Sequence, residues 1–170
     1  MEETDIWAIL ERGGAKVLVE ETEDGSIIGS MSRYEPLGDP EGTRALADLI
    51  AKKAEAHSPN VVLVWEDLED AVLGFAVAEQ MRLPAVRIYE QEGLAHFNGE
   101  LPDIPKAVFV ADAVRDTRSL EAGVALLEKN GGVLLAAIPI VEVGPTVASV
   151  PVEPLIRIGT PRTMEPDRGG

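Results

Sequence analysis

The chain has 170 residues and a mass of 18.2 kDa, a length at which one domain forms a core of ordinary size. Lys and Arg number 15 against 30 Asp and Glu, and the net charge of −15 disfavours binding to nucleic acid and to anionic membranes. The absence of cysteine excludes disulfides, thiolate metal sites and a cysteine nucleophile. No apolar run reaches the ~18–20 residues that span a bilayer and the N-terminus is acidic, so we expect a cytoplasmic protein.

The N-terminal part of the sequence predicts a short helix followed by a hairpin. Residues 4–12 alternate apolar and polar side chains at helical spacing, with Thr4 or Asp5 as the N-cap. Two apolar runs, residues 16–20 and 26–31, flank an Asp-Gly pair, and glycine accepts the positive φ that a hairpin turn requires. We therefore expect a small hairpin ahead of the main domain.

From Asp39 onward, helices and strands are predicted to alternate. Asp39 is suited to cap a long helix, and Pro40 suits its first position. The apolar runs expected to be strands are residues 61–65, 85–89, 107–110 and 133–141, with helices at 68–81 and 119–129 and a further strand within 150–158. Such a pattern is typical of a parallel sheet covered on both faces. We predict one α/β domain over residues 1–160, with a Rossmann-like sheet, and a flexible tail at 161–170.

Three loops of this predicted sheet are candidates for a ligand site. In sheets of this kind ligands bind beyond the C-terminal ends of the strands, where the chain enters the next helix. That rule selects residues 66–70, residues 90–101 and residues 112–119.

The most specific motif is the segment of residues 107–120, in which an apolar strand leads through an acid and two apolar residues into a loop that opens a helix. With residues 33–42 and 87–101, it resembles the type I phosphoribosyltransferases, most closely the orotate phosphoribosyltransferases. In that family two acids hold the ribose hydroxyls of phosphoribosyl pyrophosphate (PRPP), and a Thr-Thr-Gly-Gly-Thr/Ser loop wraps its 5′-phosphate. The resemblance covers residues 33–158 and implies that family's α/β fold and a homodimer.

The sequence departs from the family pattern at the phosphate loop. Ala111 stands where the first acid is expected, while Asp112 remains. The run Arg115-Asp116-Thr117-Arg118 replaces Thr-Thr-Gly-Gly, so the glycines that let backbone amides approach a phosphate are missing. Ser119 still matches the final hydroxyl residue.

The other two loops depart from the pattern as well. Glu66 matches the family's acid, but Asp67-Leu68-Glu69 stands where Thr-Gly-Gly would bind pyrophosphate. Each close like-charge contact there costs about 4 kcal/mol at ~4 Å and an effective dielectric constant of ~20. The expected mobile catalytic loop contains no lysine, so only Arg87 and His96 supply donors. His96 either assists proton transfer or is a surface histidine.

Several individual residues allow two interpretations. Asp112 either binds a ribose hydroxyl or caps the following helix region. Arg115, Arg118 and Ser119 either clamp a 5′-phosphate or belong to an ordinary charged loop. The acids of residues 66–70 either coordinate a divalent cation or form a solvated loop, and we predict no metal site.

The coordinated losses in three loops favour a protein that keeps the fold and has lost the transferase reaction. We expect a binding or regulatory module that holds a protein partner or a nucleotide-like small ligand. Two alternatives remain open. One is an active transferase with an atypical site, which would use Mg²⁺ to stabilise the leaving pyrophosphate. The other is a sensor of nucleoside monophosphates.

Overall fold

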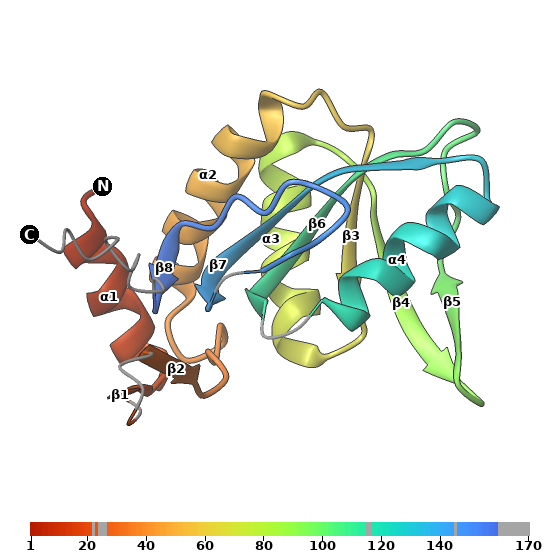
Figure 1. The fold of residues 1–170 in the computed structure, drawn as a ribbon. Helices are drawn as coiled ribbons and strands as arrows, with labels where there is room; N and C mark the ends of the chain where they lie inside the picture. Colours follow the sequence, from red (N-terminus) through yellow and green to blue (C-terminus); the bar gives the residue numbers. More distant parts are fainter. Residues whose placement is uncertain (22, 24–26, 115–116, 145, 160–170) are drawn as a thin grey trace, which may run out of the picture.

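The computed structural model describes residues 1–21, 23, 27–114, 117–144 and 146–159. Across these residues, six strands form the main sheet in the order β5-β4-β3-β6-β7-β8 (Figure 1). The strands are β3 (Val61–Trp65), β4 (Ala85–Gln91), β5 (Leu94–Asn98), β6 (Lys106–Val114), β7 (Val133–Val143) and β8 (Ile156–Ile158). Neighbouring strands are parallel except β4 and β5, which form an antiparallel hairpin. A separate antiparallel pair joins β1 (Val17–Glu21) and β2 (Ile27–Met31).

Helices cover both faces of the main sheet, as the sequence predicts. Helices α2 (Pro40–Glu55) and α3 (Leu68–Met81) pack on one face, with α1 (Glu3–Arg12) beside α2, and α4 (Arg118–Lys129) packs on the other (Figure 1). Strand β3 shows why the predicted strands are apolar without interruption: both of its faces are buried. Val62 and Val64 enter the core under α2 and α3, whereas Val61 and Leu63 enter the core under α4.

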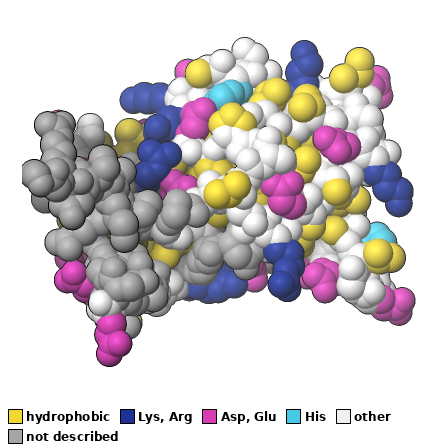
Figure 2. All heavy atoms as spheres, in the orientation of Figure 1, with side chains coloured by type: hydrophobic (Ala, Val, Ile, Leu, Met, Phe, Trp, Pro, Cys, Tyr) yellow, Lys and Arg dark blue, Asp and Glu magenta, His cyan; other side chains and the backbone are white. Residues whose placement is uncertain are grey.

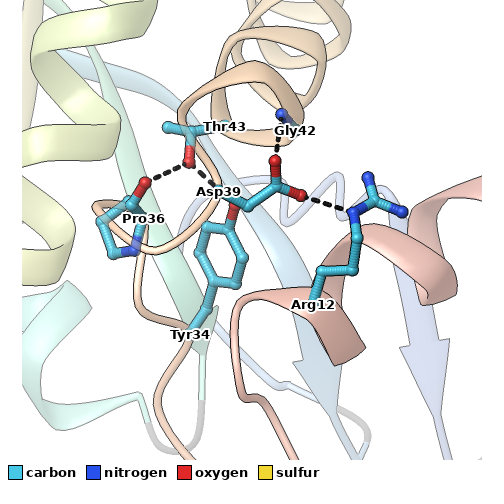
Figure 3. A network of polar contacts seen from close by, with 6 residues as sticks. All are labelled: Arg12, Tyr34, Pro36, Asp39, Gly42 and Thr43. Atoms are coloured by element: carbon cyan, nitrogen blue, oxygen red, sulfur yellow. Dashed lines mark hydrogen bonds and ion pairs between the residues drawn. The ribbon is translucent and has the colours of Figure 1, made fainter.

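The segment between β2 and α2 is tied down by a buried polar network (Figure 3). The hydroxyl of Thr43 donates to the carbonyl of Pro36 at 2.8 Å, so the fully buried Tyr34 hydroxyl, also 2.8 Å from Thr43 Oγ1, is the donor in their shared bond. Asp39 caps α2 as predicted, because its side chain accepts from the backbone N–H of Gly42 at 3.0 Å. These bonds fix the path of the chain that leads past the C-terminal ends of the strands.

The predicted N-cap of the first helix is wrong. Helix α1 begins at Glu3 and Glu2 is its N-cap, since the side chain of Asp5 accepts from the backbone N–H of Glu2 at 3.0 Å. Asp5 therefore occupies the third helical position of a capping box rather than the cap itself. The predicted Asp-Gly turn of the hairpin lies outside the described residues, as does the whole predicted tail, residues 161–170.

Two further predictions need correction. The stretch 90–101, expected to be a loop, contains β5, which a tight turn at Glu92 and Gly93 connects to β4; both turn residues have positive φ, 54° and 77°. The strand expected within 150–158 is reduced to β8 and one isolated bridge at Val152, because prolines at positions 151 and 154 interrupt the hydrogen-bonding ladder.

The outer surface carries charges of both signs. On the face drawn in Figure 2, Asp and Glu side chains are scattered among apolar and basic ones and do not gather in one patch. Within the described ranges, no helix is both long enough and apolar enough to cross a bilayer.

Candidate functional site

A cavity of about 370 Å³ opens beyond the C-terminal ends of β3, β4 and β6, where the sheet topology predicts a ligand site. The first turns of α3 and α4 complete its wall. The lining residues are Arg33, Trp65, Glu66, Asp67, Asp70, Glu90, Phe109, Ala111, Ala113, Val114, Ser119 and Leu120. Four of these side chains are acidic and one is basic, and most of the others are apolar.

Arg33 is held against the acidic side of the cavity by two carboxylates. Its guanidinium lies 3.3 Å from Asp67 and 3.2 Å from Glu69. Partial burial lowers the pKa of Arg33, but the hydrogen bond with Asp67 and the nearby negative charges outweigh it and raise the pKa. Arg33 therefore stays charged, and its charge is already shared between two carboxylates of this chain.

Asp70 is the most perturbed group of the cavity. Its side chain is only 6% exposed, and its Oδ1 accepts from the backbone N–H of Asp112 at 2.8 Å. Asp112 is itself 3% exposed, and its Oδ2 accepts from the backbone N–H of Tyr34 at 3.2 Å. Burial and the negative charge of Asp112 raise the pKa of Asp70 from 3.8 to about 7. The two acids thus link α3, β6 and the segment that carries Arg33.

The opposite wall of the cavity is apolar. It is formed by Trp65, the last residue of β3, by Phe109 and Ala111 of β6, and by Leu120 of the first turn of α4. The indole Nε1 of Trp65 is a buried donor with no hydrogen-bond partner in the described part of the chain. A ligand that fills this cavity would therefore contact carboxylates on one side and aromatic and aliphatic surface on the other.

The structure brings together part of the predicted site. Glu66, Asp67 and Ser119 line the cavity. Asp112 lies behind it, within β6 and not in a loop after a shorter strand as expected, because β6 continues to Val114.

The remaining predicted residues of the phosphate and pyrophosphate loops do not line the cavity. Glu69 does not line the cavity but forms an ion pair with Arg33, which does. Leu68 is an exposed residue of the first turn of α3. Thr117 is the N-cap of α4 without a side-chain cap bond, and Arg118 is the first residue of that helix. Arg115 and Asp116 lie outside the described residues.

The two residues assigned to a mobile loop lie on strands of the hairpin. Arg87 is an exposed residue of β4, and His96 lies on β5, where its ring stacks on that of Tyr89 at a centroid distance of 5.4 Å. Neither side chain lines the cavity. Across the residues that the structure describes, no three Asp, Glu or His side chains lie close enough to hold one metal ion.

No family model matches the sequence, and no curated protein matches it. Solved structures do match the fold. Adenine phosphoribosyltransferase from Thermoanaerobacter pseudethanolicus superposes with a TM-score of 0.68 at 15% identity, over 92% of this chain and 100% of that one. Orotate phosphoribosyltransferase from Aeropyrum pernix gives 0.64 at 17% identity, over 81% and 80% of the two chains. UMP synthase from Leishmania donovani gives 0.67 at 14% identity, over 90% of this chain and 35% of that one.

The chain has the phosphoribosyltransferase fold. The expected α/β architecture is therefore confirmed, together with the small N-terminal helix and hairpin. At 14–17% identity the likeness establishes the fold alone.

Sequence reasoning named neither Arg33 nor Glu90 as a site residue, although Glu90 is the first residue of the candidate loop 90–101. Strand β4 runs two residues further than predicted, so Glu90 reaches the cavity rim from a strand and not from a loop. Asp70 was recognised only as one acid of a loop. Its burial could have been predicted, because it falls on the stripe of α3 that continues with Leu73, Gly74 and Val77 and faces the core.

Proposed function

We propose that this protein is a binding module on a phosphoribosyltransferase scaffold and that it does not transfer phosphoribosyl groups. The observation that carries the proposal is the charge around the cavity. Glu66, Asp67 and Glu90 line it beside Asp70, which its raised pKa of about 7 leaves partly protonated at neutral pH. The guanidinium of Arg33 among them is already paired with Asp67 and Glu69.

The magnitude of the repulsion supports this proposal. PRPP carries phosphate groups at both ends of its ribose, so two or more of them would lie near these carboxylates. At ~4 Å and an effective dielectric constant of ~20, two like-charge contacts cost about 8 kcal/mol. That is about the whole binding free energy of a complex with micromolar affinity. Transfer would also need preorganised donors for the leaving pyrophosphate, where this cavity presents acceptors.

The start of α4 gives a second line of support. In a phosphate-binding loop, glycines let backbone amides come close to the anion. Here Thr117 is the N-cap of that helix, Arg118 and Ser119 are its first two residues, and the first glycine of α4 is Gly123. Side chains therefore stand where a backbone cradle would be needed.

A pyrophosphate-release assay tests the proposal. The full chain is incubated with PRPP, Mg²⁺ and each of the common nucleobases, and an active adenine phosphoribosyltransferase serves as the positive control. We expect no release above that of protein-free samples. Base-dependent release by the purified chain would contradict the proposal.

One observation favours a second candidate, a sensor of nucleoside monophosphates: Ser119 lies on the cavity wall in the first turn of α4. A monophosphate bound at a hundredfold excess over its dissociation constant would stabilise the fold by about 2.7 kcal/mol, which a melting experiment detects. Stabilisation by AMP or UMP but not by pyrophosphate is the result this candidate requires.

The homodimer that the resemblance implies is also a proposal, and sedimentation equilibrium tests it.

A further inference from the structure

The carboxyl of Asp70 has one oxygen that accepts no hydrogen bond from a described residue. Its side chain is 94% buried and lines the cavity, and Oδ1 accepts from the backbone N–H of Asp112. Oδ2 receives no hydrogen bond from any donor in the described part of the chain. Oδ2 is not fully enclosed, since among the described residues the one enclosed side-chain nitrogen or oxygen without a partner is Trp65 Nε1. Oδ2 is therefore open to the cavity, where it can accept a hydrogen bond from a ligand.

Two further carboxylates at the cavity have no counter-ion among the residues that the structure describes. Glu66 follows β3 and Glu90 lies near the end of β4, and neither forms an ion pair with a described residue. Asp67, by contrast, is paired with Arg33. The cavity thus combines an unpaired acceptor with negative charges at its rim, and both favour a ligand that carries positive charge and N–H donors.

The shape and the apolar wall of the cavity distinguish between kinds of cation. A metal ion is a point charge that requires several oxygens at one place, and no such group of three exists among the described residues. One side of this cavity of about 370 Å³ is instead aromatic and aliphatic, formed by Trp65, Phe109 and Leu120. Aromatic faces attract cations and cover flat apolar groups.

We infer that the cavity binds a small organic cation, a protonated amine or amidinium on a flat apolar body. Its N–H group donates to Asp70 Oδ2, the charges of Glu66 and Glu90 attract it, and its body packs against Trp65 and Phe109. This inference rests on the proposed function, since it assigns the ligand class of the same cavity.

Binding should be linked to the ionisation of Asp70. The charged groups that influence its pKa are Asp112 on β6, Asp67 at the start of α3, and Arg33 from the segment before α2. A bound cation opposes the burial and repulsion that keep Asp70 protonated near neutral pH, so the carboxyl releases a proton when the ligand binds. Affinity should therefore rise as the pH passes through about 7.

Titrations monitored by ¹⁵N NMR test the inference with compounds of matched shape. The full chain is titrated with benzamidine, neutral benzamide and anionic benzoate, and with phenethylamine as a second cation. We expect saturable shifts for the cations at the amide of Asp70 and the indole N–H of Trp65. Benzamide should bind at least about fivefold more weakly than benzamidine, and benzoate should not bind.

Matched variants connect binding to the carboxylates. Exposed charges contribute modestly, so Glu66→Gln and Glu90→Gln should each weaken benzamidine about threefold. The acceptor on Asp70 contributes more, because it forms a direct charge-assisted hydrogen bond with the ligand, and Asp70→Asn should weaken benzamidine binding at least about tenfold. Glu55→Gln is the control, because it removes the same charge from the exposed end of α2, near the start of β3 and away from the cavity. It should leave the affinity unchanged.

The outcomes separate this inference from the proposed function. If neither cation binds saturably, if benzoate binds as tightly as benzamidine, or if the three cavity variants behave like Glu55→Gln, the inference is wrong. The proposed function fails independently, through pyrophosphate release. A chain that neither releases pyrophosphate nor binds the cations would keep the proposed function and refute the ligand class.

Discussion

The buried carboxyl of Asp70 predicts an unusual pH dependence of stability. Its pKa is about 7 in the folded protein against 3.8 ordinarily, so between these values the folded state holds a proton that the unfolded state has released. The free energy of unfolding therefore falls as the pH rises from about 4 to about 7, and is flat above that. A pKa raised from 3.8 to about 7 corresponds to about 4 kcal/mol lost over the whole interval.

Other perturbed acids act outside this interval. Asp39 has a lowered pKa because the backbone N–H of Gly42 and then Arg12 stabilise its charge, and Glu121 has one because Ser149 donates to it. Acids with lowered pKa values make stability rise with pH, and they do so below their ordinary pKa values near 4. The interval from about 4 to about 7 therefore reports on Asp70.

Urea denaturation of the wild-type chain and of Asp70→Asn measures the effect. The amide resembles the protonated acid, because it accepts through one atom and donates through the other. The stability of the variant relative to wild type should rise by about 3 kcal/mol between about pH 5 and about pH 8, since each pH unit below 7 corresponds to ~1.4 kcal/mol. Asp48→Asn, at an exposed position of α2, is the control and should show no such change. A difference for Asp70→Asn that stays constant across this range would refute the reasoning.

Three further substitutions have defined expected outcomes. Gly74→Ala should lower the free energy of unfolding by about 1–2 kcal/mol, because the added methyl would collide with Cγ1 of Val64; a melting temperature equal to wild type would contradict this close packing. Tyr34→Phe should lower it by about 1 kcal/mol through loss of the bond to Thr43, and a double-mutant cycle with Thr43→Val would show no coupling if that bond were absent. Arg33→Gln should tighten benzamidine binding about threefold by removing a positive charge from the cavity wall, and weaker binding would oppose the inferred ligand class.

Elements with strong local patterns could be predicted well from the sequence. The bounds of β3 and α3 agree with the predicted ranges 61–65 and 68–81. Strand β3 is an uninterrupted apolar run, and α3 is a stretch of good helix-forming residues. The end of β6 could not be located in the same way. An acid at position 112 suggests the end of a strand, yet Asp112 is buried within β6, where it accepts a hydrogen bond from the distant Tyr34.

The site was predictable in position and only partly in composition. The rule that ligands bind at the C-terminal ends of parallel strands locates the cavity, and it finds Glu66, Asp67 and Ser119. Arg33 could not be assigned to it from local patterns, because it precedes β3 by about thirty residues and reaches the cavity through tertiary contacts. The raised pKa of Asp70 likewise depends on burial beside Asp112, a neighbour in space that is 42 residues away in the chain.

Isothermal titration calorimetry with PRPP and Mg²⁺ tests the proposed loss of phosphoribosyl transfer without requiring a product. The carboxylates around the cavity predict no saturable heat at PRPP concentrations where a phosphoribosyltransferase with this fold, used as the control, binds fully. Saturable micromolar binding to the wild-type chain, especially if Glu66→Gln left it unchanged, would contradict the conclusion that these acids exclude the sugar phosphate.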